Sequence, residues 1–216
     1  MSENLHLAIY FTTPAERSRL LSDLSTVVLS QGFQYSPLLD ADPKLSEQLG
    51  RIEREGQGSL DFWKPGPMEF NLSLCFDPVL LGLPLGSPVK ELLIMCNESY
   101  VKDSPNAAAN LELLIGLLLR LNGIVKGEYG WGGYNPAPPD PTVAERQALR
   151  GLRWLNLLGA RLVEQFGRSR LLDAPVWKVE ELGDGTILVL LGPDPDRYEP
   201  SSAERLREYF GLPIED

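Results

Sequence analysis

Histidine and cysteine are scarce in this chain of 216 residues, which contains one histidine, His6, and two cysteines, Cys75 and Cys96. Zinc sites take several Cys or His ligands at set spacings, and these three residues do not supply them. A Ser-His-Asp or Cys-His catalytic device would depend on His6, which lies in an expected strand close to the N-terminus. We therefore expect no metal site and no cofactor, and we interpret both cysteines as core residues.

Positive charge is also in short supply, because 20 Lys and Arg residues stand against 30 Asp and Glu residues, a formal net charge of −10. Nucleic-acid binding needs clustered Lys and Arg to contact phosphates, so no nucleic-acid partner is expected. An acidic surface serves solubility, and it also steers a basic protein such as a nuclease toward its binding site. The excess is uneven, since residues 180–216 hold ten acidic residues and three arginines.

The sequence lacks the features of a secreted or membrane protein. Glu3 and Asn4 interrupt the start of the chain, where a secretory signal would have an apolar core. Residues 111–121 are the most apolar run, but they include Glu112 and Arg120 and fall short of the roughly 20 residues that span a bilayer. We expect a cytoplasmic protein with reduced thiols and no membrane partner.

The first two thirds of the chain show alternating strand and helix patterns without a linker that would divide two domains, so we expect one domain over residues 1–216. Strands are expected at 5–11, 68–76, 89–97 and 124–128, with 56–64 as an edge strand or a loop. Helices are expected at 14–30, 45–55 and 106–122. The last of these is apolar nearly all round, which predicts a central place in the core.

Residues 152–195 determine the expected fold class. Apolar residues at spacings of three and four predict a buried helix over 151–166, which ends at Gly167. A strand at 176–182, with Trp177 directed to the core, a Gly-Asp-Gly turn and an apolar strand at 186–191 predict an antiparallel hairpin. With a last helix at 202–210, we expect an α+β fold: an antiparallel or mixed sheet of about five to six strands, with helices packed mainly on one face.

The same stretch carries a family resemblance. The WLNLLG helix, the strand after it and a GDG-turned strand ending in LLGPDP resemble bacterial immunity proteins of the type VI immunity family or the immunity protein 52 family. The similarity covers the last third of the chain and, loosely, the β-α-β-β order before it. It implies a non-enzymatic protein that binds a cognate toxin of a type VI secretion or polymorphic toxin system. The negative charge favours a nuclease toxin, whose active site the protein would occlude.

Residues 127–141 (GEYGWGGYNPAPPDP) are dense in glycine, proline and aromatic residues, and they predict an ordered surface loop. Rigid aromatic side chains supply contact area at low entropic cost, which favours a recognition surface. The alternative function is a small-molecule or carbohydrate-binding domain that stacks ligands on these rings. In a third interpretation the rings fold back and cap the core. The candidate partner-binding residues are Glu128, Tyr129, Trp131, Tyr134 and Asp140, together with Asp194 and Asp196 after the hairpin.

The sequence leaves open whether Asp and Glu side chains catalyse a reaction or hold a cation. Two Asp or Glu side chains in one cleft suffice for general acid–base catalysis, so a hydrolase remains a further hypothesis. Asp194 and Asp196 could also hold a cation, although turn formation explains the Pro-Asp-Pro-Asp sequence better. We expect no catalytic residues, and we expect the protein to act by surface complementarity.

Overall fold

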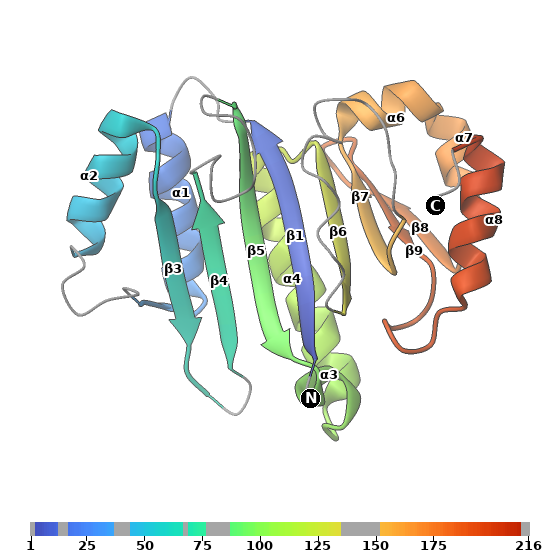
Figure 1. The fold of residues 1–216 in the computed structure, drawn as a ribbon, viewed down its shortest axis with the longest axis horizontal. Coiled ribbons are helices and arrows are strands. Elements are labelled where there is room, and N and C mark those ends of the chain that lie inside the picture. The colour runs from blue at the N-terminus through green and yellow to red at the C-terminus, as the bar shows by residue number, and fades with distance from the viewer. Residues whose placement is uncertain are drawn as a thin grey trace.

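One antiparallel sheet of nine strands organises the structure, a computed structural model that describes residues 3–12, 17–36, 44–66, 69–76, 87–134 and 152–212. Its strand order is β2-β3-β4-β5-β1-β6-β7-β9-β8 (Figure 1). The α+β class is confirmed, but the expected five to six strands are too few, partly because the short strands β2 and β7 do not stand out in the sequence. The strands are β1 (Asn4–Thr12), β2 (Gln34–Tyr35), β3 (Ser59–Lys64), β4 (Phe70–Cys75), β5 (Val89–Asn97), β6 (Tyr129–Tyr134), β7 (Leu155–Leu158), β8 (Lys178–Glu181) and β9 (Ile187–Leu190).

The helices of the described residues pack on both faces of this sheet. α1, α2 and α4 share one apolar core with β1, β3, β4 and β5. α6, α7 and α8 pack on the other face, against β7 and β9 (Figure 1). The expectation of helices mainly on one face is therefore wrong. The helices are α1 (Arg17–Ser30), α2 (Leu45–Glu55), α3 (Ser99–Lys102), α4 (Ala107–Val125), α6 (Ala160–Phe166), α7 (Arg168–Leu172) and α8 (Pro200–Phe210).

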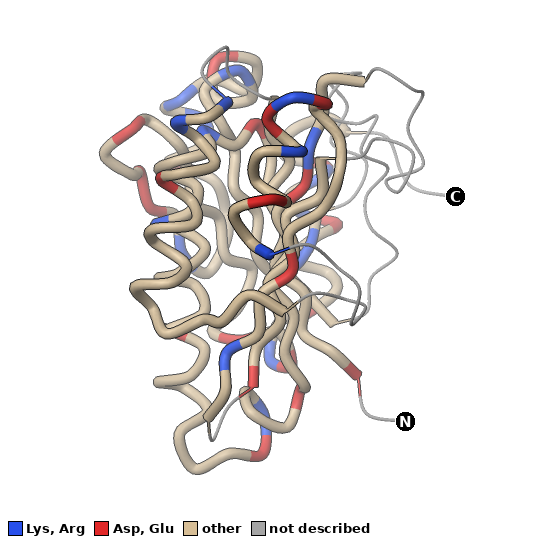
Figure 2. Tube along the Cα trace, turned by 90° about the vertical axis from the view of Figure 1, so that its left-hand side faces the viewer, with Lys and Arg blue, Asp and Glu red and all other residues tan. Residues whose placement is uncertain are grey.

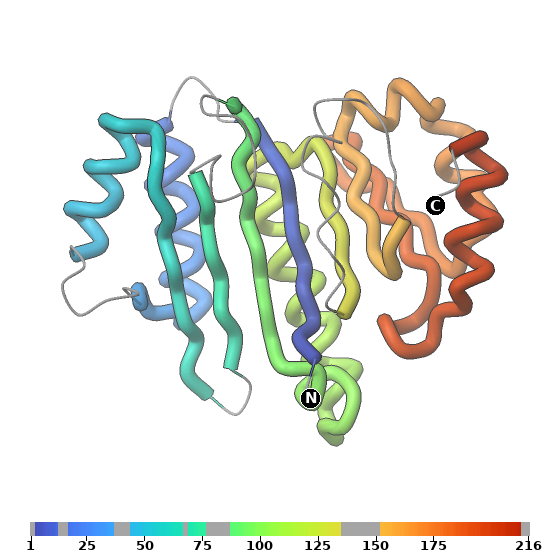
Figure 3. The backbone as a smooth tube through the Cα atoms, in the orientation of Figure 1, coloured from blue at the N-terminus to red at the C-terminus, as the bar shows by residue number. Residues whose placement is uncertain are grey.

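The N-terminal strand β1 lies in the middle of the sheet, between β5 and β6 (Figure 3). Its sequence LHLAIYF is apolar at almost every position, and a strand buried on both faces needs this composition. Leu5, Leu7, Ile9 and Phe11 point into the core with α1 and α4, while Ala8 and Tyr10 belong to the core on the opposite face. The two halves of the molecule are thus joined through a strand that both cores share.

The helix expected over 151–166 is in part a strand. β7 spans Leu155–Leu158, and only Ala160–Phe166 forms the helix α6, with Gly159 at its N-cap. All four residues of β7 are buried, and a continuous apolar run of this kind does not distinguish a buried helix from a buried strand. Gly159 is required where the chain turns, since an added Cβ would lie 2.3 Å from the carbonyl oxygen of Gly127.

The strand expected at 124–128 and the loop expected at 127–141 also need correction. α4 continues to Val125 and ends at Lys126, a left-handed C-cap. Residues 129–134 then form strand β6, which pairs with β1 on one side and β7 on the other. Gly130 and Gly132 are strand residues that allow close packing, because an added Cβ would lie 2.9 Å from the Ala8 carbonyl oxygen at Gly130 and 2.5 Å from the Leu7 side chain at Gly132. Residues 135–141 lie outside the described part of the chain.

The C-terminal hairpin is confirmed, because β8 and β9 are antiparallel neighbours. β8 lies at the edge of the sheet, and this explains why only Val179 of its four residues has apolar character. Trp177, which was expected in the core, precedes β8 and is 55% exposed. The two cysteines are buried on neighbouring strands, Cys75 on β4 and Cys96 on β5, as expected for core residues.

Candidate protein-binding groove

An apolar groove of about 680 Å³ lies between α4 and the β8–β9 hairpin. Leu188 and Leu190 of β9 form its floor, and both are buried. One wall consists of α4 residues from Ala107 to Leu119, and the other contains Trp177, Lys178 and Glu180. The groove exists because α4 covers the middle of the sheet, whereas no described helix covers β9 and β8 on this face (Figure 1).

α4 uses two of its faces differently. Leu114, Leu117, Leu118 and Leu121 are buried against the sheet and α1. On the neighbouring face, Leu111, Ile115 and Leu119 line the groove at helical spacings of four. The sequence pattern, apolar nearly all round, predicts a helix that is central to the core. The structure confirms this central place and shows in addition that part of the apolar surface faces the open groove.

Judged by length and composition alone, α4 is also long and apolar enough to cross a membrane. In the structure, 39% of the 18-residue stretch on which this judgement rests is buried. A core helix of a soluble protein passes the same test, so this signal is weak. Packing against the sheet on one face and lining a groove on another requires the same composition.

A turn with two aspartates forms one end of the groove. The Asp194 carboxylate accepts the backbone N–H groups of Asp196 at 3.1 Å and Arg197 at 2.8 Å, and it pairs with the Arg197 guanidinium. The Asp196 carboxylate accepts the Tyr134 hydroxyl at 2.8 Å and lies 3.2 Å from the Lys102 ammonium. These donors explain the Pro-Asp-Pro-Asp sequence as a turn. In the residues that the structure describes, no group of three or more His, Cys, Asp or Glu side chains is placed to hold a metal ion.

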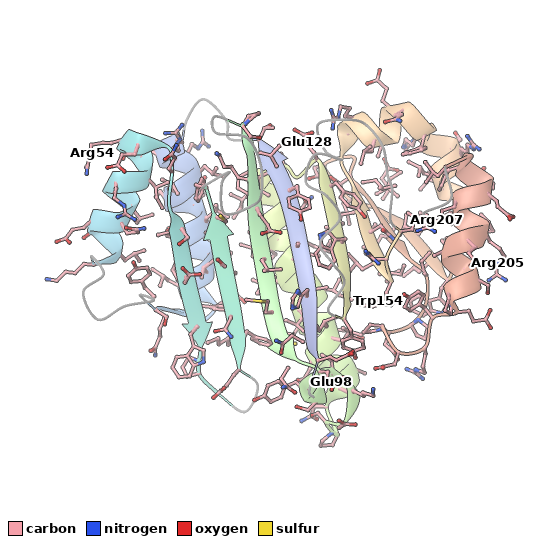
Figure 4. All side chains as sticks on the ribbon, in the orientation of Figure 1. Arg54, Glu98, Glu128, Trp154, Arg205 and Arg207 are labelled. Atoms are coloured by element: carbon pink, nitrogen blue, oxygen red, sulfur yellow. The ribbon has the colours of Figure 1, made fainter. Side chains whose placement is uncertain are left out.

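The electrostatics at this end are dominated by carboxylates. Burial raises the pKa of the Tyr134 hydroxyl, and the hydrogen bond to Asp196 and the charges of Glu98 and Asp194 raise it further. The hydrogen bond to Asp196, helped by its charge, likewise raises the pKa of Lys102. Tyr134 therefore stays a neutral donor, and Lys102 stays a cation. Glu98 lies beside α3, and Glu128 lies near the other end of the strands (Figure 4).

The structure brings together three of the predicted site residues, Tyr134, Asp194 and Asp196. Glu128 lies apart from them and forms an ion pair with Arg161 of α6 at 2.9 Å. Asp140 lies outside the described residues. Sequence reasoning misses the exposed groove residue Trp177 as a site residue. The period-two pattern that Trp177 shares with Val179 predicts a side chain directed to the core. Trp177 is instead exposed, because β8, which follows it, lies at the edge of the sheet.

Tyr129 and Trp131 are buried, 2% and 1% exposed, on the sheet face that also carries Tyr10 of β1 and Glu91 of β5. They are packed in a strand and do not form the exposed aromatic platform expected of a loop. The Tyr129 hydroxyl donates to the Asn156 side chain at 3.3 Å. This arrangement corresponds to the interpretation in which the rings cap the core.

Glu91 of β5, on the same face of the sheet, is a carboxyl whose pKa is shifted. Burial raises its pKa, and the hydrogen bond from the Tyr10 hydroxyl opposes this effect in part. Burial and the nearby Glu91 also raise the pKa of Tyr10. Burial on this face therefore favours the neutral forms of both side chains more than water would.

Comparison with known proteins gives one informative result. No protein-family model matches the chain, and no curated protein matches it. Among solved structures, the fold is similar to "Pseudomonas aeruginosa T6SS protein PA0821", with a TM-score of 0.53 and 14% sequence identity. The similarity covers 97% of this chain and 72% of that one. At this level of identity the match shows a shared fold over almost the whole chain.

Proposed function

We propose that this protein is a cytoplasmic immunity protein that binds a cognate bacterial toxin and neutralises it by occluding the active site. The observation that carries the proposal is the fold, which is similar over 97% of the chain to that of a T6SS protein from Pseudomonas aeruginosa. The resemblance of the last third of the sequence to immunity proteins also supports it, although the WLNLLG residues that it takes as a helix are largely strand β7.

Charge favours a basic partner. The whole chain has a formal net charge of −10, and both signs are interspersed along its described part (Figure 2). An acidic protein accelerates its encounter with a basic partner through long-range attraction, and salt weakens this effect. A nuclease toxin is basic where it binds nucleic-acid phosphates, so acidic side chains of an immunity protein can take the place of the substrate. A nuclease is therefore the class of toxin that we propose.

In this proposal the protein carries out no reaction of its own. The open groove presents an apolar floor and an exposed Trp177, which are features of a binding surface. The polar groups at its end are occupied with one another, as in the Tyr134–Asp196–Lys102 contacts. Neutralisation then depends on affinity and on coverage of the toxin's active site.

The experiment is co-expression with the toxin domain encoded beside this protein's gene. We expect induction of the toxin to stop growth, and co-expression of this protein to restore it. A toxin variant without its catalytic residues, tagged for pull-down, should capture the protein from the same cells. If growth stays arrested although the protein accumulates in soluble form, the proposed function is wrong.

A further inference from the structure

The α4 wall of the groove has space for a partner. Small residues, Ala107, Ala108 and Gly116, interrupt the larger side chains along this wall. A Cβ added at Gly116 would meet no atom within 4 Å. The wall extends from residue 107 to residue 119, which at 1.5 Å per residue corresponds to about 18 Å, the length of a helix of about three turns.

The charge of the groove is unbalanced. Each of the three cations among its described lining residues already pairs with a carboxylate: Lys102 with Asp196, Lys178 with Glu180, and Arg197 with Asp194. Glu112, halfway along the α4 wall, forms no ion pair with the described residues. The charge that remains is negative, so the complementary ligand carries a cation opposite the middle of α4.

An apolar groove between a helix and a hairpin is the geometry that accepts an amphipathic helix. Trp177 stands on the hairpin wall, and tryptophan is among the residues that most often dominate binding energy at interfaces. Leu188 and Leu190 below it offer an apolar floor for side chains that recur every three or four residues.

We propose that this groove docks an amphipathic helix of the cognate toxin, about three turns long, with an apolar stripe toward Leu188 and Leu190 and a Lys or Arg facing Glu112. The identity of the partner rests on the proposed function. A second copy of this chain fits poorly, because it would bring another acidic groove rim to the contact. An anionic membrane surface fits poorly for the same reason.

Two glycines of α4 supply a matched pair of variants. Gly116→Leu places a bulky side chain inside the groove, and Gly123→Leu places the same side chain two turns further along α4, beyond the residues that line the groove. An added Cβ meets no atom within 4 Å at either position, and leucine is a better helix former than glycine. Both variants should therefore fold, and circular dichroism with thermal unfolding checks this before binding is measured.

The first test uses a labelled synthetic peptide, about four turns long, with leucines on one face and lysines on the flanks, and a second peptide with glutamates in place of the lysines. Fluorescence anisotropy should show binding of the lysine peptide to the wild type and to Gly123→Leu. We expect Gly116→Leu and Glu112→Lys each to weaken it by about tenfold. Equal affinity of all four proteins, or preference for the glutamate peptide, would overturn the groove assignment.

The second test repeats the growth-rescue experiment with the same variants. We expect the wild type and Gly123→Leu to restore growth, and Gly116→Leu to lose rescue although it accumulates normally. Rescue by Gly116→Leu at the wild-type level would remove the groove from the toxin contact and leave the immunity function standing. Absence of rescue by the wild type, together with selective peptide binding, would instead overturn the immunity function and keep the helix-binding groove.

Sedimentation of each protein alone and with anionic vesicles completes the test, since groove-dependent dimers or vesicle binding would contradict a toxin helix as the occupant.

Discussion

Replacing Asn156 by alanine tests the local fold that positions the groove. Asn156 lies in β7, next to β9, and its side chain is fully buried. Its amide group donates to the backbone carbonyl of Arg153 at 2.7 Å and accepts the Arg153 N–H at 3.0 Å and the Tyr129 hydroxyl at 3.3 Å. One side chain thus holds the entry to β7 and ties it to β6.

The expected loss follows from these three contacts. A buried polar group left without its partner costs about 1–3 kcal/mol, and the low end applies here because the contacts to Arg153 are only part-buried. Counting about 1 kcal/mol for each of the three groups gives a loss of about 3 kcal/mol in the free energy of unfolding. Tyr129→Phe removes one of the three contacts and should cost about 1 kcal/mol.

The sign of the effect separates the two interpretations of this segment. If residues 151–166 formed one helix, Asn156→Ala would replace a poor helix former by the best one and would raise stability by up to about 0.7 kcal/mol. In the observed strand it lowers stability. Urea unfolding followed by circular dichroism measures the difference as a shift of the midpoint at constant slope. A stability equal to or above that of the wild type would refute the strand assignment, and additive losses in the Asn156→Ala, Tyr129→Phe double variant would refute their contact.

Three further predictions concern other parts of the fold. Gly159→Ala should lower the free energy of unfolding by about 3 kcal/mol or more, because the new methyl group would lie 2.3 Å from the Gly127 carbonyl oxygen and 2.9 Å from two backbone atoms of Glu128. Gly183→Ala, whose Cβ meets no atom within 4 Å, should change the same quantity by less than about 1 kcal/mol, and chemical denaturation of both variants measures the difference. Glu91 has a folded-state pKa above its unfolded value, so the folded state binds more protons and the free energy of unfolding should fall as pH rises above the usual glutamate pKa. Glu91→Gln should remove this fall. Equal pH profiles of the unfolding midpoint in the wild type and in Glu91→Gln would contradict the prediction. Burial raises the pKa of the Cys96 thiol to about 12. In a Cys75→Ser variant we therefore expect the remaining thiol to react with a disulfide reagent near pH 8 only after unfolding. Stoichiometric labelling of the native variant would contradict this expectation.

Several elements could be predicted because local chemistry is sufficient for them. Strict alternation in residues 70–75 and the Gly-Asp-Gly turn before β9 depend on the side-chain period of a strand and on turn conformation, which act over a few residues. The acidic charge and the scarcity of histidine and cysteine are properties of composition, and composition alone narrows the classes of function open to this chain.

Other features depend on neighbours that are distant in the chain. Apolar runs such as Leu155–Leu158 satisfy a buried helix and a buried strand equally, and pairing with β6 and β9 decides between them. The rings of Tyr129 and Trp131 look like a recognition loop in sequence, but they become core residues because β6 pairs with β1 and β7.

The groove itself is a product of tertiary structure. Its floor comes from β9, its walls from α4 and the residues around β8, and its acidic end from the turn that contains Asp194 and Asp196. In the sequence, Trp177 has the pattern of an inward-facing strand residue, and α4 has the pattern of a fully buried helix. Trp177 is exposed because β8 lies at the sheet edge, and part of α4 is exposed because no described helix covers β9 and β8 on this face. Sequence therefore determined the types of surface available to this protein, and only the packing of distant segments decided which of them is exposed. The reason is that burial is a property of the assembled sheet and not of any single stretch of chain.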